Sequence, residues 1–157
     1  MKFRFPIVII DEDFRSENTS GLGIRALAQA IESEGFEVVG VTSYGDLSQF
    51  AQQQSRASAF ILSIDDEEFT PGPDLDPAVL NLRHFIDEVR RKNADVPIYI
   101  YGETKTSRHL PNAILRELHG FIHMFEDTPE FVARHLIREA KSYLEGIQPP
   151  FFKALLD

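Results

Sequence analysis

Acidic and hydroxyl side chains stand where three apolar runs of the sequence end. Asp11 and Asp13 follow the first run, Asp65 follows the third, and Thr104 follows the fourth. A pair of carboxylates binds a hard cation such as Mg²⁺, and the cation neutralises a phosphoryl group that another carboxylate accepts. These four residues therefore form a candidate acidic site, in which Asp65 is the candidate phosphate acceptor.

The apolar runs that position this site are short and β-branched, as strands buried on both faces are. Apolar residues recur at helical spacing between them, so strands and helices alternate along the chain. The alternation predicts a three-layer α/β domain of flavodoxin/receiver-like fold, with a five-stranded parallel sheet of order 2-1-3-4-5 and helices on both faces. The predicted strands are Phe5–Ile10, Phe36–Val41, Ala59–Ile64, Pro97–Tyr101 and Phe121–Phe125.

Helix ends carry recognisable residues. Asn18 offers a capping side chain for the first helix, and Gly35 is a natural stop after it. Pro77 and Pro129 fit the first turn of two later helices, and Ser43 can cap another. A short helix is expected over Leu110–Leu118, and the last helix is expected to face inward with Phe131, Val132, Leu136, Ile137, Ala140 and Leu144.

The acidic site resembles that of a response-regulator receiver domain. Such a domain places a lysine after its fifth strand to contact the phosphate, but here that strand runs FIHMFEDTPE, and Lys105 follows the fourth strand instead. The site at Asp11, Asp13, Asp65 and Thr104 is therefore degenerate. A stand-alone receiver phosphorylated on Asp65 remains the alternative, while the simpler interpretation is that these acids cap helices and stay solvated.

Other catalytic and metal-binding patterns are missing from the sequence. There is no cysteine, and no histidine pairs with another at metal-ligand spacing. The glycines of Gly21–Gly23 lack the continuation of a dinucleotide-binding loop, and Ser63 lacks a G-x-S-x-G elbow. His123 lies inside an apolar strand, where we expect a hydrogen-bonded core residue rather than a base. We therefore expect no catalytic, cofactor-binding or metal-binding residue in this chain.

The composition limits the partners. A net charge of -9 over 157 residues disfavours nucleic-acid binding, because phosphates are repelled. No apolar run approaches membrane-spanning length, and the first residues do not form a signal peptide. We expect a cytoplasmic protein without nucleic-acid or membrane partners. A small nucleotide-binding flavodoxin-like protein is a weaker alternative, since the three acids that begin DEDFRSENTSG would repel phosphate.

Two longer stretches carry a second resemblance. Val8–Leu47 begins VIIDEDFRSENTSGLGIRALAQAIESEGFEVVGV, and Glu139–Asp157 reads EAKSYLEGIQPPFFKALLD. Both are similar to the N-terminal domain of the bacterial ornithine/lysine/arginine decarboxylases, and the order of features agrees across essentially the whole chain. The resemblance implies a receiver-like domain over residues 1–146 and the start of a linker over residues 147–157. That linker leads toward a domain absent from this chain, which binds pyridoxal 5'-phosphate.

The apolar tail fits this resemblance. Pro149 and Pro150 end the last helix, since proline cannot continue one. Phe151, Phe152 and Leu155 then have apolar surface that would pack against the next segment of the parent enzyme or against another subunit. The chain is accordingly expected to be a fragment, and the alternative is that the tail folds back on its own domain.

In this family the parent enzyme removes the α-carboxylate of arginine, lysine or ornithine, releases CO₂ and a polyamine-type amine, and consumes a proton. Several members serve acid resistance. The resemblance implies that the catalytic and cofactor-binding residues lie in the later domain. It gives this domain a structural role at contacts with neighbouring protomers, in homo-oligomers from dimers up to decameric rings.

Two surface features complete the expectations. Some inducible family members bind a guanosine tetraphosphate alarmone between subunits, and Arg116 stands where it could meet a phosphate, although a solvated helix residue is the favoured interpretation. An acidic surface is also expected to repel its copy at neutral pH and to associate on acidification. Its candidate residues are Asp65, Asp66, Glu67, Glu68, Asp74 and Asp76.

Overall fold

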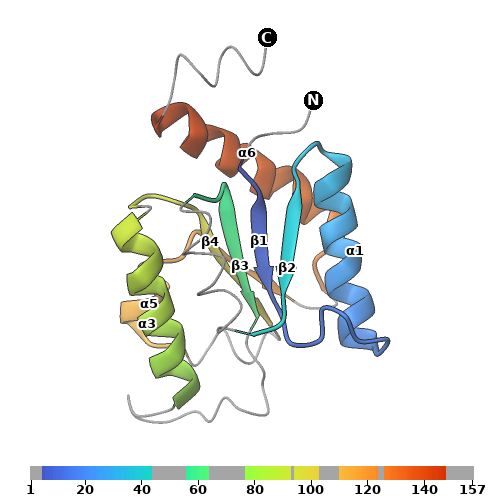
Figure 1. The fold of residues 1–157 in the computed structure, drawn as a ribbon, viewed down its shortest axis with the longest axis horizontal. Helices are drawn as coiled ribbons and strands as arrows, with labels where there is room; N and C mark the ends of the chain where they lie inside the picture. Colours follow the sequence, from blue (N-terminus) through green and yellow to red (C-terminus); the bar gives the residue numbers. More distant parts are fainter. Residues whose placement is uncertain are drawn as a thin grey trace.

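The computed structural model describes residues 5–43, 56–63, 77–92, 94–102, 110–123 and 126–147, with the backbone alone at residues 77–81, 92 and 147. Its centre is a five-stranded sheet in which every neighbouring pair is parallel, in the order β2-β1-β3-β4-β5 (Figure 1). The predicted sheet and strand order are therefore confirmed. The strands are β1 (Ile7–Ile10), β2 (Val38–Val41), β3 (Ala59–Ser63), β4 (Ile98–Gly102) and β5 (Gly120–His123).

Helices cover both faces of the sheet. The long helices α1 (Thr19–Ser33) and α6 (Pro129–Ile147) pack on one face, and α3 (Pro77–Lys92) packs on the other with the short α5 (Asn112–Leu115) (Figure 1). A parallel sheet needs such cover, because its strands are joined by crossovers that place helices on its faces. The molecule thus has the three layers expected from the alternating pattern.

The helix ends follow the local signals in the sequence. The Asn18 side chain accepts a hydrogen bond of 2.8 Å from the Gly21 backbone N–H at the start of α1. Gly35 stands just beyond the end of that helix with a φ of 102°, a conformation that costs glycine little. Pro77 and Pro129 are the first residues of α3 and α6. All four predicted ends are confirmed.

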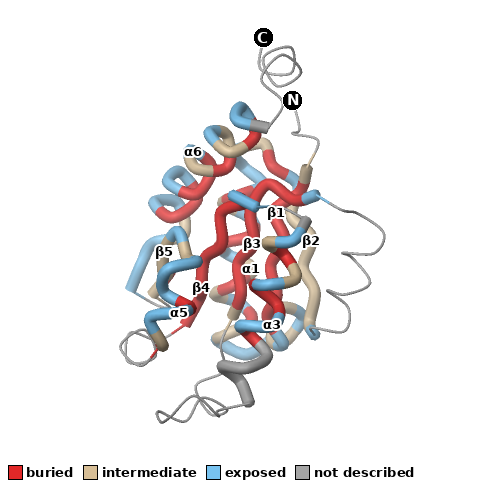
Figure 2. The backbone as a smooth tube through the Cα atoms, turned by 90° about the vertical axis from the view of Figure 1, so that its left-hand side faces the viewer, coloured by how far each residue is buried: buried red, intermediate tan, exposed pale blue. Residues whose placement is uncertain are grey.

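The hydrophobic core consists of two clusters, one on each face of the sheet. The strand β1 contributes to both, since Ile7 and Ile9 point to the α1–α6 face while Val8 and Ile10 point to the α3 face. None of these four side chains is more than 3% exposed. Figure 2 shows the same pattern, with the buried residues concentrated in the strands and along the inner sides of the helices.

Several elements differ from the prediction in extent. β2 begins at Val38 rather than Phe36, although Phe36 is buried in the core. The helix expected over Leu110–Leu118 is helical only over Asn112–Leu115, because Pro111 precedes it and turns follow it. The helix predicted after Ser43, the acidic loop that follows β3, and the ends of the third and fifth predicted strands fall on residues outside the described part of the chain.

One expected core residue is not in the core. Phe131 is 65% exposed, whereas its neighbour Val132 is 9% exposed. Successive helical residues differ by about 100° in direction, so only one of two adjacent apolar residues can point fully at the sheet. The inward face of α6 is formed by Val132, Ala133, Leu136, Ile137, Ala140 and Leu144, and adjacent pairs flank the centre of that face. Phe131 lies on the side of the helix opposite Ala140, so it points away from the sheet.

Candidate functional site

Asp11 and Asp13, the first half of the predicted acidic site, lie together in the loop between β1 and α1. Asp11 is 4% exposed, and its Oδ1 accepts a hydrogen bond of 2.8 Å from the Asp13 backbone N–H. The backbone N–H of Asp11 in turn donates to the Val41 carbonyl of β2 at 3.0 Å. This arrangement closes the turn that leaves the sheet.

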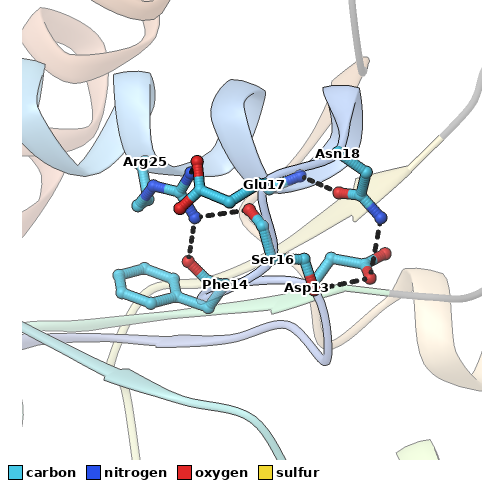
Figure 3. Close-up of polar contacts among 7 residues, drawn as sticks. Asp13, Phe14, Ser16, Glu17, Asn18 and Arg25 are labelled. Atoms are coloured by element: carbon cyan, nitrogen blue, oxygen red, sulfur yellow. Dashed lines mark hydrogen bonds and ion pairs between the residues drawn. The ribbon is translucent and has the colours of Figure 1, made fainter.

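The Asp13 carboxylate is engaged with the start of α1. Its Oδ1 accepts hydrogen bonds from the Ser16 hydroxyl at 3.3 Å and from the Asn18 side-chain amide at 3.2 Å (Figure 3). Asn18 is the same residue that caps α1, so the carboxylate fixes the orientation of the cap. Asp13 therefore stabilises the loop through its contacts with Ser16 and Asn18, and whether it also binds a cation stays a prediction.

Arg25 holds the same loop from the side of the helix. Its Nη1 donates to the carbonyl oxygens of Phe14 at 2.8 Å and Ser16 at 2.7 Å, and its Nη2 lies 3.8 Å from a Glu17 carboxylate oxygen (Figure 3). A guanidinium offers five donors in a planar fork and is well suited to two carbonyls at once. No sequence motif pointed to Arg25, because its partners are backbone atoms.

Gly21 is the position at which α1 touches this loop most closely. A Cβ on residue 21 would lie 2.1 Å from the Ser16 carbonyl oxygen and 2.5 Å from that of Asp13. This close approach explains why residue 21 is a glycine. The first turn of α1 lies directly on the loop, and no side chain fits between them.

The second half of the predicted site falls outside the described residues. This holds for Asp65 and Thr104, and for Lys105, so their geometry relative to Asp11 and Asp13 stays a prediction. Within the described ranges, no group of three or more histidine, aspartate or glutamate residues lies close enough to hold a metal ion.

His123, predicted as a hydrogen-bonded core residue, lies at the end of β5. It is only partly buried, and its Nδ1 is 3.3 Å from an Asp127 carboxylate oxygen.

A cavity of about 240 Å³ opens between α1 and the start of α6, at the carboxyl ends of β4 and β5. Tyr101, at the end of β4, lines it and is 5% exposed. Burial and then the nearby Asp11 carboxylate raise the pKa of the Tyr101 hydroxyl from 10.0 to about 12. The other residues that line the cavity are Gly23, Ala26, Leu27, Ile122, Glu126, Asp127, Thr128, Pro129 and Val132.

A second cavity, of about 380 Å³, lies between the end of α3 and the residues that lead into β4 and β5. Arg116, the candidate phosphate contact, is exposed at its edge, as a solvated helix residue would be. The Arg90 guanidinium makes three hydrogen bonds within the domain. It donates to the Val96 carbonyl at 2.6 Å, to the Glu117 carbonyl at 2.8 Å and to the Glu117 carboxylate at 3.1 Å. His119 has a lowered pKa, chiefly from desolvation and then from the charge of Arg90, against the opposing charges of Glu139 and Asp95.

Three large apolar side chains of the described residues are exposed. Leu22 of α1 is 55% exposed, Phe131 of α6 is 65% exposed, and Leu115 of α5 is 41% exposed. Leu22 and Phe131 adjoin residues that line the cavity between α1 and α6, and Leu115 belongs to the opposite helical layer. The apolar tail residues Pro149, Pro150, Phe151, Phe152 and Leu155 lie outside the described residues. Among the described helices, none has the length and apolar character needed to cross a membrane.

The sequence matches the family model of the Orn/Lys/Arg decarboxylase N-terminal domain over residues 19–143. It is 27% identical over 158 residues to the lysine decarboxylase LdcA of Pseudomonas aeruginosa, covering 98% of this chain and 20% of that protein. It is 23% identical over 152 residues to the biodegradative arginine decarboxylase of Escherichia coli, covering 96% of this chain and 19% of that protein. The chain thus spans about a fifth of the length of these relatives.

Solved structures show the same relationship. The lysine decarboxylase A structure from Pseudomonas aeruginosa superposes with a TM-score of 0.81 at 26% identity, over 99% of this chain and 20% of that chain. An orphan response regulator of H. pylori superposes with a TM-score of 0.60 at 10% identity, over 89% of this chain and 99% of that chain. The second likeness is one of fold alone, and it matches the receiver-like architecture predicted from the sequence.

Proposed function

The chain belongs to the family of Orn/Lys/Arg decarboxylase N-terminal domains, and from this premise we propose that it is the assembly domain of a pyridoxal-phosphate-dependent basic amino acid decarboxylase. In this proposal the domain mediates contacts between subunits and carries no catalytic residue. The parent enzyme releases CO₂ from arginine, lysine or ornithine in the cytoplasm, and it serves amino acid and polyamine metabolism or acid resistance.

The family match over residues 19–143 is the observation that carries the proposal. The likeness to a lysine decarboxylase subunit supports it, because this chain corresponds to one fifth of that subunit. A catalytic domain would then occupy part of the remaining length. The linker of the proposed parent begins at residues 147–157, where Pro149, Pro150, Phe151, Phe152 and Leu155 are the proposed contacts with that domain or with a neighbouring protomer.

The described residues do not fit pyridoxal phosphate. Its covalent attachment requires a lysine amine at the edge of a cavity, and no lysine is among the described residues that line the two cavities. The mouth of the cavity between α1 and α6 also carries Glu126 and Asp127, which would repel the cofactor's phosphate. In the proposal the cofactor therefore binds to a later part of the subunit.

The exposed apolar side chains support a role in assembly. Leu22 and Phe131 leave apolar surface in water, and covering a leucine or phenylalanine side chain completely is worth about 1.5–3 kcal/mol. Aromatic residues are also enriched at the centres of protein interfaces. We propose that a neighbouring protomer or the rest of the subunit covers this surface, in oligomers from the dimer up to the decamer.

The first experiment is to isolate the native protein from its own cells with an antibody against this domain. The proposal predicts a subunit several times heavier than 17.9 kDa, with the absorbance of pyridoxal phosphate and with CO₂ release from at least one of arginine, lysine and ornithine. A native product of about 17.9 kDa that lacks the cofactor would contradict the proposal. The relative rates on the three amino acids would identify the substrate.

Assembly is tested in the full-length oligomer with the variant Leu22→Ser/Phe131→Ser. We expect its oligomer to dissociate at a higher protein concentration than the wild type in sedimentation analysis, while pyridoxal phosphate stays bound. Leu115→Ser is the matched control, because it removes a comparable exposed leucine from the other helical layer. Unchanged association of the double variant would remove these residues from the interface.

The acidic cluster Asp65, Asp66, Glu67, Glu68, Asp74 and Asp76 remains a proposal for acid-dependent association. It is tested by changing the six carboxylates to amides and following the oligomeric state of the full-length protein as the pH falls.

The receiver-like fold supports a second candidate function, which is phosphorylation of Asp65 in a stand-alone receiver. Acetyl phosphate should then add one phosphate to the wild type and none to Asp65→Asn, as measured by intact mass.

A further inference from the structure

The cavity between α1 and α6 has apolar walls, a buried hydroxyl and carboxylates among its lining residues. We propose that it binds a linear aliphatic amine in its ammonium form. The meaning of this site for regulation rests on the function proposed above, but the binding itself rests only on the geometry of this chain.

The walls of the cavity suit a chain of methylene groups. Ala26 and Leu27 line it from α1, Ile122 lines it from β5, and Pro129 and Val132 line it from α6. Its volume of about 240 Å³ admits a short unbranched chain and falls below the usual range for drug-sized ligands. Burying each methylene group of such a ligand raises the affinity about fourfold, so the length of the chain sets much of the affinity.

The charged residues at the cavity select a cation. Glu126 and Asp127 line it, and no lysine, arginine or histidine is among the described residues that line it. The Oδ2 atom of Asp127 accepts a hydrogen bond of 2.8 Å from the backbone N–H of His123. The Nδ1 atom of His123 lies 3.3 Å from the same oxygen. The N-terminus of α6 opposes a cation, whereas the carboxylates of Glu126 and Asp127 attract one. An anionic ligand of the same length would meet repulsion instead.

Tyr101 supplies a hydrogen-bonding group inside the cavity. Its side chain is 5% exposed, and Tyr101 lines the cavity at the end of β4. The hydroxyl stays neutral at physiological pH and can accept a hydrogen bond from an ammonium N–H. The nearby Asp11 charge, which acts on this tyrosine, favours a cation there as well.

The proposed function gives this ligand a source. Removing the carboxylate from lysine leaves 1,5-diaminopentane, a linear aliphatic diamine of the class that the cavity fits. An assembly domain that binds the product would let the product concentration influence how the subunits associate. The site would then be regulatory and separate from the reaction centre.

The test is calorimetric titration of the 157-residue chain with 1,5-diaminopentane. The helices of the chain cover both faces of its sheet, so the chain can be studied without the rest of the subunit. We expect binding by the diamine, and at least about tenfold weaker binding by the neutral 1-pentanol and by pentanoate, since each lost ion contact costs on the order of 1 kcal/mol. Amide chemical shifts from Ala26, Ile122 and Val132 should move during the titration.

Three variants separate the cavity from general attraction to an acidic protein. Ala26→Phe fills the cavity from an exposed helical position and should abolish binding, and Glu126→Gln/Asp127→Asn should weaken it by about tenfold or more. The control Glu32→Gln/Glu34→Gln removes two exposed charges near the far end of α1 and should bind as the wild type does. Circular dichroism shows whether each variant is folded, and Ala26→Leu is used if Ala26→Phe is not.

Equal weakening in the control variant would overturn the proposal, as would undiminished binding in both folded Ala26 variants. Binding of 1-pentanol or pentanoate as tightly as the diamine would also overturn it. Because the titration uses this chain alone, its outcome does not depend on the activity of a longer protein. Diamine binding without any decarboxylase activity in the native protein would leave the site standing and remove the link to product concentration.

Discussion

The ring of Phe14 lies directly against the α-carbon of Gly40. A Cβ on residue 40 would fall 2.3 Å from Cε1 of that ring and 2.4 Å from Cζ, which is closer than carbon atoms approach without displacement. Phe14 belongs to the loop after β1, and Gly40 lies in β2 opposite Ile9 of β1. The contact therefore fastens the β1–α1 loop to the edge strand of the sheet.

Gly40→Ala is expected to destabilise the chain by about 1–3 kcal/mol, because the ring must move from a packed position. Urea unfolding measures the change. Gly146→Ala is the matched control: nothing lies within 4 Å of a Cβ at that helical position, so it should stabilise by about 0.5–1 kcal/mol. Combining Gly40→Ala with Phe14→Leu should recover part of the loss, and strict additivity of the two changes would argue against the contact.

Arg25→Met is expected to lower the free energy of unfolding by about 1.5–3 kcal/mol. The change removes hydrogen bonds from a charged donor to two carbonyl groups, those of Phe14 and Ser16. The side chain is 27% exposed, so water replaces the lost contacts only in part. Arg134→Met serves as the control, since the hydrogen bond that Arg134 makes with a described residue, the Glu130 carbonyl, is 3.4 Å long and exposed. That control should change stability by less than about 0.5 kcal/mol, and equal losses in both variants would contradict the assigned role of Arg25.

Leu136→Ala and Phe131→Ala are expected to differ sharply although both truncate large apolar residues of α6. Leu136 is 0% exposed in the core, so its loss should cost about 2–5 kcal/mol in denaturant unfolding. Phe131 is 65% exposed and should cost less than about 0.5 kcal/mol in the isolated chain. Comparable losses would show that Phe131 packs inward, as its apolar character alone had suggested.

The chain is expected to lose stability in alkaline solution through its buried tyrosines. The folded pKa of Tyr101, about 12, exceeds the ordinary 10.0, so above pH 10 the unfolded chain releases a proton that the folded chain retains. Stability is therefore full below about pH 10 and falls as the pH rises toward about 12. Burial, followed by Glu139, raises the pKa of Tyr99 in the same direction. Tyr101→Phe should reduce the loss measured between about pH 8 and about pH 11, and an unchanged loss would exclude Tyr101 as a contributor.

Acidification is expected to act through His119. Its folded pKa lies below the ordinary 6.5, so the unfolded chain binds a proton first as the pH falls. The stability contribution of neutral His119 is therefore present above pH 6.5 and is lost below it, through the folded pKa. His119→Gln should flatten the dependence of the unfolding free energy on pH in this window. A histidine titration by NMR that places the pKa of His119 above 6.5 would contradict this prediction.

The sheet and its helical layers could be predicted from the sequence because each depends on the pattern of apolar residues within one short segment. A β-branched run such as IVII in β1 is buried on both sides in a parallel sheet, and the spacing of Ile24, Leu27 and Ile31 places one face of α1 inward. The signals that predict the helix ends are also local, because Asn18 and Gly35 act within one turn of the ends of α1. These signals need no knowledge of distant parts of the chain.

The remaining features depend on contacts that the sequence does not display. Gly40 must be small because Phe14, 26 positions earlier, lies over it. Arg25 bonds to carbonyl groups, which every residue possesses, so its partners leave no signature. For the candidate acidic site, the sequence indicated that Asp11 and Asp13 would be neighbours. It did not distinguish between a carboxylate held for a cation and one that holds Asn18 and Ser16, as Asp13 does.

The position of α6 has a consequence for the synthesis of the chain on the ribosome. Four of the five strands, β1 to β4, are made before residue 103, yet α6 is complete on the α1 face of the sheet only after residue 147 has been added. Until then Ile7, Ile9 and Ile61 present an apolar surface that α1 alone covers. At about 5–20 residues per second, that interval lasts several seconds. A nascent chain of this length is therefore the form most in need of a chaperone, and ribosome profiling of chaperone-bound chains should show binding until α6 has emerged.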